Sequence, residues 1–175
     1  MYSILPVVYV AFLLVLLGGA GWAIFRQVMK TRKVETQISK LQSKLSKEKG
    51  TAQEYYELGA IFLDKKLFAQ AIAQFQKALK LENLEAEENA RIYNALGFAH
   101  FSQEQYDLAI RNYKEALKTD PNYTTALNNL GHVYERKQLT AQALEAYEQV
   151  LKQEPKNSIA KRRAESLRKR LVPSA

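Results

Sequence analysis

The hydropathy pattern of this chain opens with an uninterrupted apolar run, since residues 4–25 contain no charged side chain. As a helix this run would be about 33 Å long, enough to cross a hydrocarbon core of about 30 Å. Arg26, Lys30 and Arg32 follow it closely, and Trp22 lies near its basic end, where an aromatic residue anchors a helix at the membrane interface. The pattern predicts a transmembrane anchor over residues 1–25, with the rest of the chain on the cytoplasmic side.

A cleaved signal peptide is the alternative interpretation of the same run. Signal peptides have a basic start and a shorter apolar core, and this segment lacks both features. The small residues at 18–20 nevertheless keep cleavage open as an alternative.

The next segment, residues 26–50, predicts a basic juxtamembrane helix or linker. Its apolar positions Val34, Ile38, Leu41 and Leu45 are spaced four, three and four apart, which places them on one side of a helix. A short coiled coil, a helix on an anionic membrane surface and a solvated stalk all fit this stripe. We expect the helix to end at Gly50.

A different pattern occupies residues 51–157, where one arrangement of apolar and small residues occurs three times. Each copy has leucine one residue before a glycine, alanine twelve residues after it and an aromatic ring sixteen after it. The copies are Leu58, Gly59, Ala71 and Phe75; Leu96, Gly97, Ala109 and Tyr113; and Leu130, Gly131, Ala143 and Tyr147. A glycine inside a helix costs about 1 kcal/mol relative to alanine, so its recurrence requires a structural reason.

This pattern resembles the tetratricopeptide repeat, in which each unit is a pair of antiparallel helices. The resemblance implies an all-α fold: an N-terminal transmembrane helix, an α-solenoid of three tetratricopeptide repeats at 52–85, 90–123 and 124–157, and a C-terminal capping helix. We expect the two backbones of each pair to come closest at the glycine and alanine positions. The first two glycines are 38 residues apart instead of 34, and Asn83 stands where the later repeats have proline, so we expect the preceding helix to extend there.

The final segment, residues 158–175, predicts a basic capping helix and tail. We expect Ile159, Leu167 and Leu171, together with two alanines, to cover the last repeat. The basic residues of the segment would then face solvent, although contact with an acidic partner or lipid is an alternative. Those expected to do so are Arg162, Arg163, Arg168, Lys169 and Arg170.

Composition, charge and the motifs of the sequence argue against several classes of function. The formal net charge of +8 divides into +6 at residues 26–50, −4 at 51–155 and +6 at 156–175, so nucleic-acid binding is not expected. The chain has no cysteine and only His100 and His132 as histidines, of which we expect His100 to be packed in the core and His132 to be a contact residue. No phosphate loop, dinucleotide motif or metal-binding histidine pair occurs, so we expect no enzyme, no cofactor and no metal.

In tetratricopeptide-repeat proteins the first helix of each repeat lines a concave groove that binds protein partners. The resemblance places Ala60, Leu63, Thr125 and Glu135 at lining positions, and it implies that partners bind Tyr56, Arg91, Asn94, Phe98, Phe101, Asn128 and His132. Family members that bind chaperone tails use a basic and amide clamp for the terminal carboxylate. The clamp positions here are Tyr56, Ala60, Ala95, Thr125 and Asn129, so that clamp is absent.

The complete layout resembles a small family of cyanobacterial and plastid-encoded proteins implicated in photosystem I assembly. The resemblance implies a scaffold anchored in the thylakoid membrane by residues 4–25, with its repeats on the cytoplasmic or stromal side. Photosystem I subunits or assembly intermediates would be its partners. A scaffold for an envelope or protein-import complex, a secreted soluble adaptor, and a homo-oligomer formed through the stalk or anchor stay open as alternatives.

Overall fold

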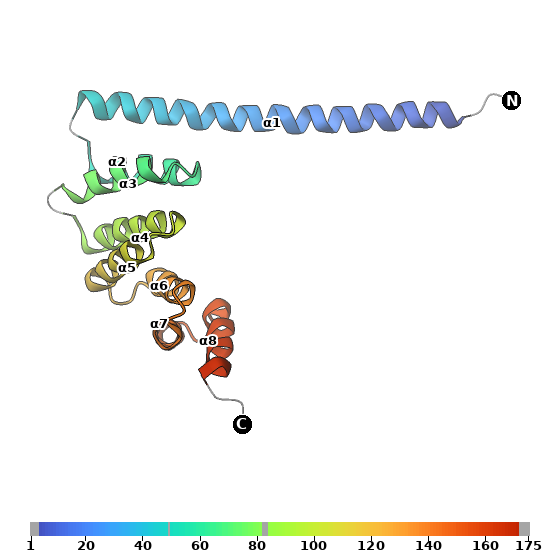
Figure 1. Cartoon of the computed structure of the whole chain (residues 1–175). Coiled ribbons are helices and arrows are strands. Elements are labelled where there is room, and N and C mark those ends of the chain that lie inside the picture. The colour runs from blue at the N-terminus through green and yellow to red at the C-terminus, as the bar shows by residue number, and fades with distance from the viewer. Residues whose placement is uncertain (1–3, 49, 82–83, 172–175) are drawn as a thin grey trace. The chain divides into compact units, whose positions relative to one another are not determined.

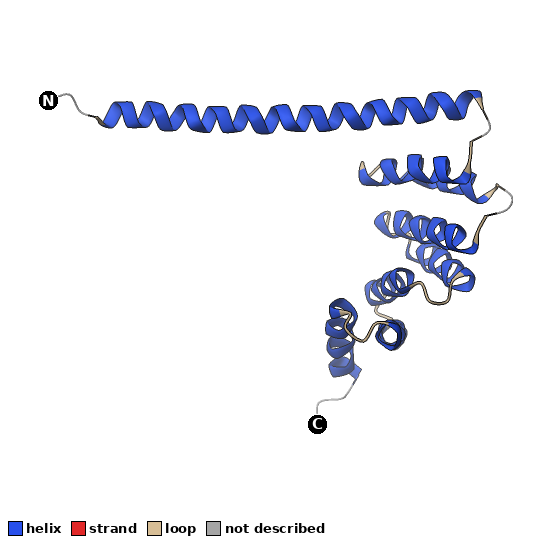
Figure 2. Ribbon diagram, turned by 180° about the vertical axis from the view of Figure 1, so that it is seen from behind, coloured by secondary structure: helices blue, strands red, loops and turns tan. Residues whose placement is uncertain are grey.

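A computed structural model describes residues 4–48, 50–81 and 84–171, and Figure 2 shows helices joined by short loops over this part of the chain. The chain divides into two compact units, residues 1–48 and 49–175. The helices are α1 (Leu5–Lys47), α2 (Ala52–Asp64), α3 (Phe68–Leu79), α4 (Ala86–Ser102), α5 (Tyr106–Thr119), α6 (Thr124–Arg136), α7 (Thr140–Gln153) and α8 (Ser158–Leu171).

The first unit is one continuous helix, α1, of 43 residues. Every described side chain from Pro6 to Lys33 is exposed, including Trp22 at 67%. By its length and composition the helix could cross a membrane, a test that an N-terminal signal sequence also passes. It ends at Lys47, so the expected end at Gly50 was wrong.

The second unit is an α-solenoid, in which α2 pairs with α3, α4 with α5, and α6 with α7 (Figure 1). Each second helix also packs on the first helix of the next pair, and α8 packs on α7. The predicted all-α solenoid of three repeats with a C-terminal cap is therefore confirmed.

Aromatic rings explain the three helical glycines. A Cβ at Gly59 would lie 2.6 Å from Cε1 of Phe75, and one at Gly97 would lie 2.6 Å from Cε1 of Tyr113. The third repeat is similar, because a Cβ at Gly131 would be 2.9 Å from a ring carbon of the corresponding tyrosine. The glycine therefore admits a ring from the partner helix, and the nearest atoms are not the backbone atoms that we expected.

The alanines twelve residues after each glycine serve the same packing. Ala71, Ala109 and Ala143 are fully buried at the contact between the two helices of each pair. One continuous core cluster then runs from Ala109 of α5 to Leu167 of α8. Close packing of small and aromatic side chains thus holds the repeats together.

Each repeat turns between its two helices through a residue with positive φ, although none of these residues is glycine. Lys66, Glu104 and Gln138 have φ of 59°, 59° and 60°. In each turn the next residue donates its backbone N–H to a carbonyl five residues back, for example Leu67 N to Phe62 O at 2.8 Å. This is a Schellman ending, which favours glycine at the left-handed position.

The four extra residues of the first junction form an additional helical turn. The helix α4 has 17 residues, whereas α2 and α6 have 13 each, and its additional length precedes Gly97. The helix α3 ends at Leu79, so the prediction that it would extend was wrong; Asn83 itself lies outside the described residues.

The C-terminal helix α8 covers the last repeat through fewer residues than expected. Ala160, Ala164 and Leu167 are buried against the core. Ile159 and Leu171 are 55% and 45% exposed, so their predicted packing was wrong. The side chain of Asn157 accepts the backbone N–H of Ala160 at 3.0 Å and caps the start of this helix.

Candidate functional site

The predicted lining positions lie on three neighbouring helices, because α2 contacts α4 and α4 contacts α6. We call these positions the first-helix face. It comprises Tyr56, Ala60 and Leu63 of α2, Arg91, Asn94, Phe98 and Phe101 of α4, and Thr125, Asn128, His132 and Glu135 of α6.

Phe98 is the prominent apolar group of this face. Its side chain is 43% exposed, although phenylalanine gains free energy when it is buried. Tyr56 and Phe101 are half-buried, which leaves Phe98 as the aromatic side chain of the face most available to a partner. Thr125, at the beginning of α6, is exposed as well.

Phe101 joins two repeats instead of standing free. Its ring lies 4.9 Å from the ring of His132 on α6 and 5.8 Å from the ring of Tyr106 on α5. Aromatic pairs at these separations stabilise packing beyond simple area burial. The inter-repeat packing that the sequence left open therefore accounts for Phe101, and Phe98 needs another explanation.

Amide side chains form a second group on the face. Asn129 donates its Nδ2 to Oδ1 of Asn94 at 3.0 Å, which links α6 to α4. Oδ1 of Asn128 is buried and has no hydrogen-bond partner within the part of the chain that the structure describes. The predicted contact residues Asn94 and Asn128 thus differ: Oδ1 of Asn94 accepts a hydrogen bond, whereas Oδ1 of Asn128 accepts none from the described residues.

Tyr56 and Arg91 meet at the junction of the first two repeats. Both line a small hollow between α2 and α4, together with Gln53 and Glu88. The Tyr56 ring also packs 5.7 Å from that of Phe75, which fixes its position. The α4 side of this hollow carries one acidic and one cationic side chain, and the hollow is too small for more than about one water molecule.

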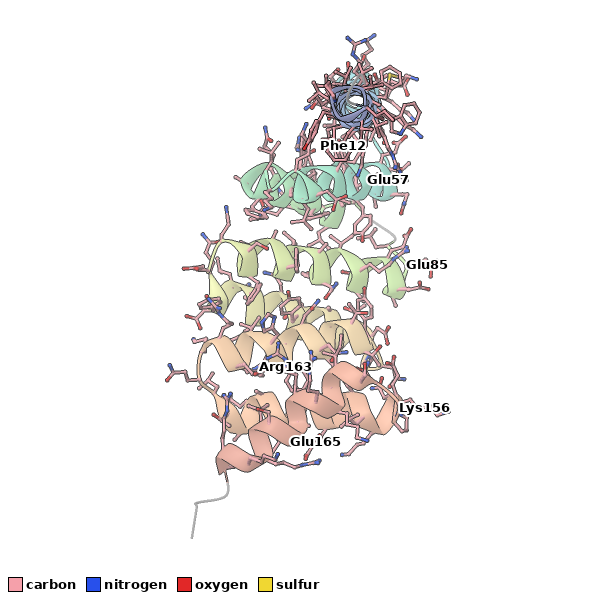
Figure 3. All side chains as sticks on the ribbon, turned by 90° about the vertical axis from the view of Figure 1, so that its right-hand side faces the viewer. Phe12, Glu57, Glu85, Lys156, Arg163 and Glu165 are labelled. Atoms are coloured by element: carbon pink, nitrogen blue, oxygen red, sulfur yellow. The ribbon has the colours of Figure 1, made fainter. Side chains whose placement is uncertain are left out.

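Glu135 is the centre of a charged network at the C-terminal end of the face. Its Oε1 accepts the Tyr147 hydroxyl at 2.7 Å, and its Oε2 pairs with Nη1 of Arg163 at 3.4 Å. Figure 3 places Arg163 on the side of α8 that faces the preceding helices. The tyrosine ring that the third glycine admits therefore carries a hydroxyl that orients the glutamate.

The same network controls two protonation equilibria. Burial, together with the hydrogen bond to the Glu135 carboxylate, raises the pKa of Tyr147 above its usual value. Burial and then the Arg163 cation lower the pKa of His132 below 6.5, partly opposed by Glu135. His132 is therefore held in its neutral form against Phe101.

The prediction for two arginines of α8 needs completing, and that for His100 needs correction. The side chains of Arg163 and Arg168 are 42% and 53% exposed, as a solvent-facing side requires, but Arg163 also pairs with Glu135 and Arg168 with Glu148 at 2.7 Å. His100 is half-buried and not a core residue; its Nδ1 lies 2.7 Å from Oε1 of Gln105 across the turn. The equivalent position in the third repeat, Tyr134, is 7% exposed.

The role of Arg163 could have been found from repeat spacing. Arg163 lies 34 residues after Asn129, so it occupies the same repeat position if α8 is treated as the first helix of a further unit. Both side chains reach back to the preceding first helix, Asn129 to Asn94 and Arg163 to Glu135. The correspondence between Arg163 and Asn129 is visible only when α8 is aligned with the first helices of the repeats.

The chemistry of the face is that of recognition through aromatic, amide and charged groups. Within residues 4–48, 50–81 and 84–171, no cluster of three or more histidine or acidic side chains is arranged to hold a metal ion. The first-helix face offers one exposed ring, two amides and a glutamate held by a hydrogen bond and an ion pair, which suit a protein surface or segment.

Comparison with protein families identifies the repeats. Models of the tetratricopeptide repeat match residues 52–83 and 124–157, and a related repeat model matches residues 99–138. Among solved structures, the crystal structure of MamA superposes with a TM-score of 0.72, covering 80% of each chain at 23% identity. This structural likeness supports the fold alone.

Relatives are found among proteins of photosynthetic organisms. The ycf37 protein of Guillardia theta is 36% identical over 173 residues, covering 98% of this chain and 97% of that protein. The chloroplastic tetratricopeptide-repeat protein PYG7 of Arabidopsis thaliana is 34% identical over 93% of this chain, which spans 54% of PYG7. The photosystem I assembly protein Ycf3 of a Synechococcus strain is 29% identical over 49% of each chain.

Proposed function

This chain belongs to the ycf37 family of tetratricopeptide-repeat proteins, and we propose that it is a non-enzymatic, membrane-anchored scaffold that assists the assembly or stability of photosystem I. The observation that carries this proposal is its similarity to Ycf3, a protein whose name records a role in photosystem I assembly. Its similarity to a chloroplastic relative, PYG7, supports the same cellular setting.

The proposed anchor is the apolar part of α1. Its side chains are exposed and apolar up to Phe25, and basic residues begin at Arg26. Such a helix is stable in a lipid bilayer and costly in water. The positive-inside rule then places the repeats on the cytoplasmic or stromal side of a thylakoid membrane.

The proposed partner surface is the first-helix face, with Phe98 as its apolar anchor. An exposed ring on the same face as amides and a charged network resembles the combination of apolar and polar groups in a protein interface. Photosystem I subunits or assembly intermediates are the proposed partners.

Affinity purification tests the partner and the surface together. The tagged chain is purified in mild detergent from photosynthetic membranes, and the co-purifying proteins are quantified by mass spectrometry. We expect enrichment of photosystem I subunits over other membrane complexes. Phe98→Ala should reduce that enrichment at least tenfold, because truncating an interface anchor typically costs about 2 kcal/mol or more.

Leu108→Ala is the matched control, because Leu108 on α5 is 42% exposed but does not belong to the first-helix face. Equal losses in both variants would contradict the proposed surface. Recovery of an envelope or import complex instead of photosystem I would contradict the proposed partner. The intact mass of the purified chain also tests the anchor, since signal cleavage would remove the apolar segment.

A further inference from the structure

The outer side of α8 carries cations that its capping role does not use. Ala160, Ala164 and Leu167 bury one side of the helix, so the opposite side is open. We call its exposed cations the basic face of α8; they are Lys161, Arg162, Lys169 and Arg170.

These four cations differ from the other two on the same helix. Arg163 and Arg168 form ion pairs with glutamates of α6 and α7. Within the described residues, no ion pair involves any member of the basic face. The only acidic residue of the helix is Glu165, labelled in Figure 3, so the face keeps a surplus of positive charge.

An exposed apolar side chain lies beside the basic face near the beginning of the helix. Ile159, three residues before Arg162, is 55% exposed. Basic residues combined with exposed aliphatic groups are typical of a helix lying at a membrane interface. Aromatic residues, which dominate protein-interface hot spots, are absent from the α8 sequence.

We propose that the basic face of α8 docks on the anionic lipid headgroups of the membrane in which α1 is anchored. This inference rests on the membrane anchoring that forms part of the proposed function. Because both elements belong to one chain, the anchor keeps α8 at a high effective concentration near the lipid surface, so modest attraction suffices. The docked helix would orient the repeats while leaving Phe98 on α4 free for a partner.

The test exploits the absence of native cysteine. The full chain carrying Ser166→Cys, at an exposed position of α8, is labelled with a fluorophore and reconstituted into vesicles. The vesicles contain phosphatidylcholine alone or with phosphatidylglycerol, and a headgroup-linked quencher reports contact. We expect strong quenching only in the phosphatidylglycerol vesicles, and its loss at about 1 M salt, where the Debye length is about 3 Å.

Charge removal provides the matched comparison. Arg162→Gln with Lys169→Gln should lower the docking equilibrium constant about 25-fold, because each of the two cations near an anionic surface contributes about fivefold. The control, Arg111→Gln with Lys114→Gln on α5, removes the same charge from exposed positions and should leave quenching unchanged.

Vesicle flotation separates failure of the anchor from failure of docking. Flotation without quenching, or equal quenching in both lipids, would overturn docking alone. Absence of flotation with both lipids would overturn the anchor and the docking together. Quenching that requires membrane proteins in addition to lipid would assign the basic face to an acidic protein partner and overturn the proposal.

Discussion

The two units of the chain use glycine and apolar side chains in opposite ways. In α1 a Cβ at Gly18, Gly19 or Gly21 would have no neighbouring atom within 4 Å, whereas in the repeats each helical glycine faces an aromatic ring. The apolar side chains of α1 from Val7 to Met29 are exposed, while those of the repeats form a core. The repeat unit therefore carries its own folding free energy, and α1 depends on what surrounds it.

The largest expected effect comes from filling a repeat glycine. Gly97→Leu should lower the free energy of unfolding of the repeat unit by about 2 kcal/mol or more, because the new side chain collides with the buried ring of Tyr113. Gly19→Leu in α1 is the control and should leave it unchanged. Chemical denaturation of both variants measures the contrast. If the two variants unfolded with the same free energy, the proposed difference between the repeat glycines and the α1 glycines would be contradicted.

A smaller effect of opposite sign is expected at a repeat turn. Glu104→Gly should stabilise the repeat unit by about 1 kcal/mol, because φ of 59° strains a residue that has a Cβ. Its neighbour Gln103, with φ of −96°, should lose stability when changed to glycine. Thermal unfolding compares the two, and stabilisation by both changes would contradict the proposed strain.

The smallest effect is a pH dependence confined to the repeat unit. His132 has a lowered pKa, so as pH falls below 6.5 the unfolded chain binds a proton that the folded chain resists. The free energy of unfolding should therefore be highest above that pH and should decrease as the pH falls toward the lower pKa that His132 has in the folded state. His132→Gln should remove this contribution, and Arg163→Gln should reduce it. Denaturation curves across this pH range that coincide for wild type and His132→Gln would contradict the assignment.

The repeat fold was predictable because its packing residues recur at fixed spacing. Gly97, Ala109 and Tyr113 identified a helical pair, although the sequence did not reveal that the ring itself fills the space above the glycine. The longer α4 was missed because one additional turn suits either neighbouring helix and only tertiary packing decides between them.

The candidate site was less predictable, because repeat position determines the direction of a side chain but not its partner. Phe98 and Phe101 both occupy positions of the first helix that are expected to line the groove, yet Phe98 is exposed and Phe101 packs on His132. Ion pairing of Arg163 depended on the docking of α8, which local pattern could not specify.

The most direct test of the account measures photosystem I assembly in cells. Newly synthesised photosystem I subunits are followed by pulse labelling in cells that lack the chain and in cells that carry wild type, Phe98→Ala or Leu108→Ala. The account predicts slow entry of subunits into the complex without the chain or with Phe98→Ala, and normal entry with wild type or Leu108→Ala. An unchanged rate of entry in cells lacking the chain would contradict its role as an assembly scaffold.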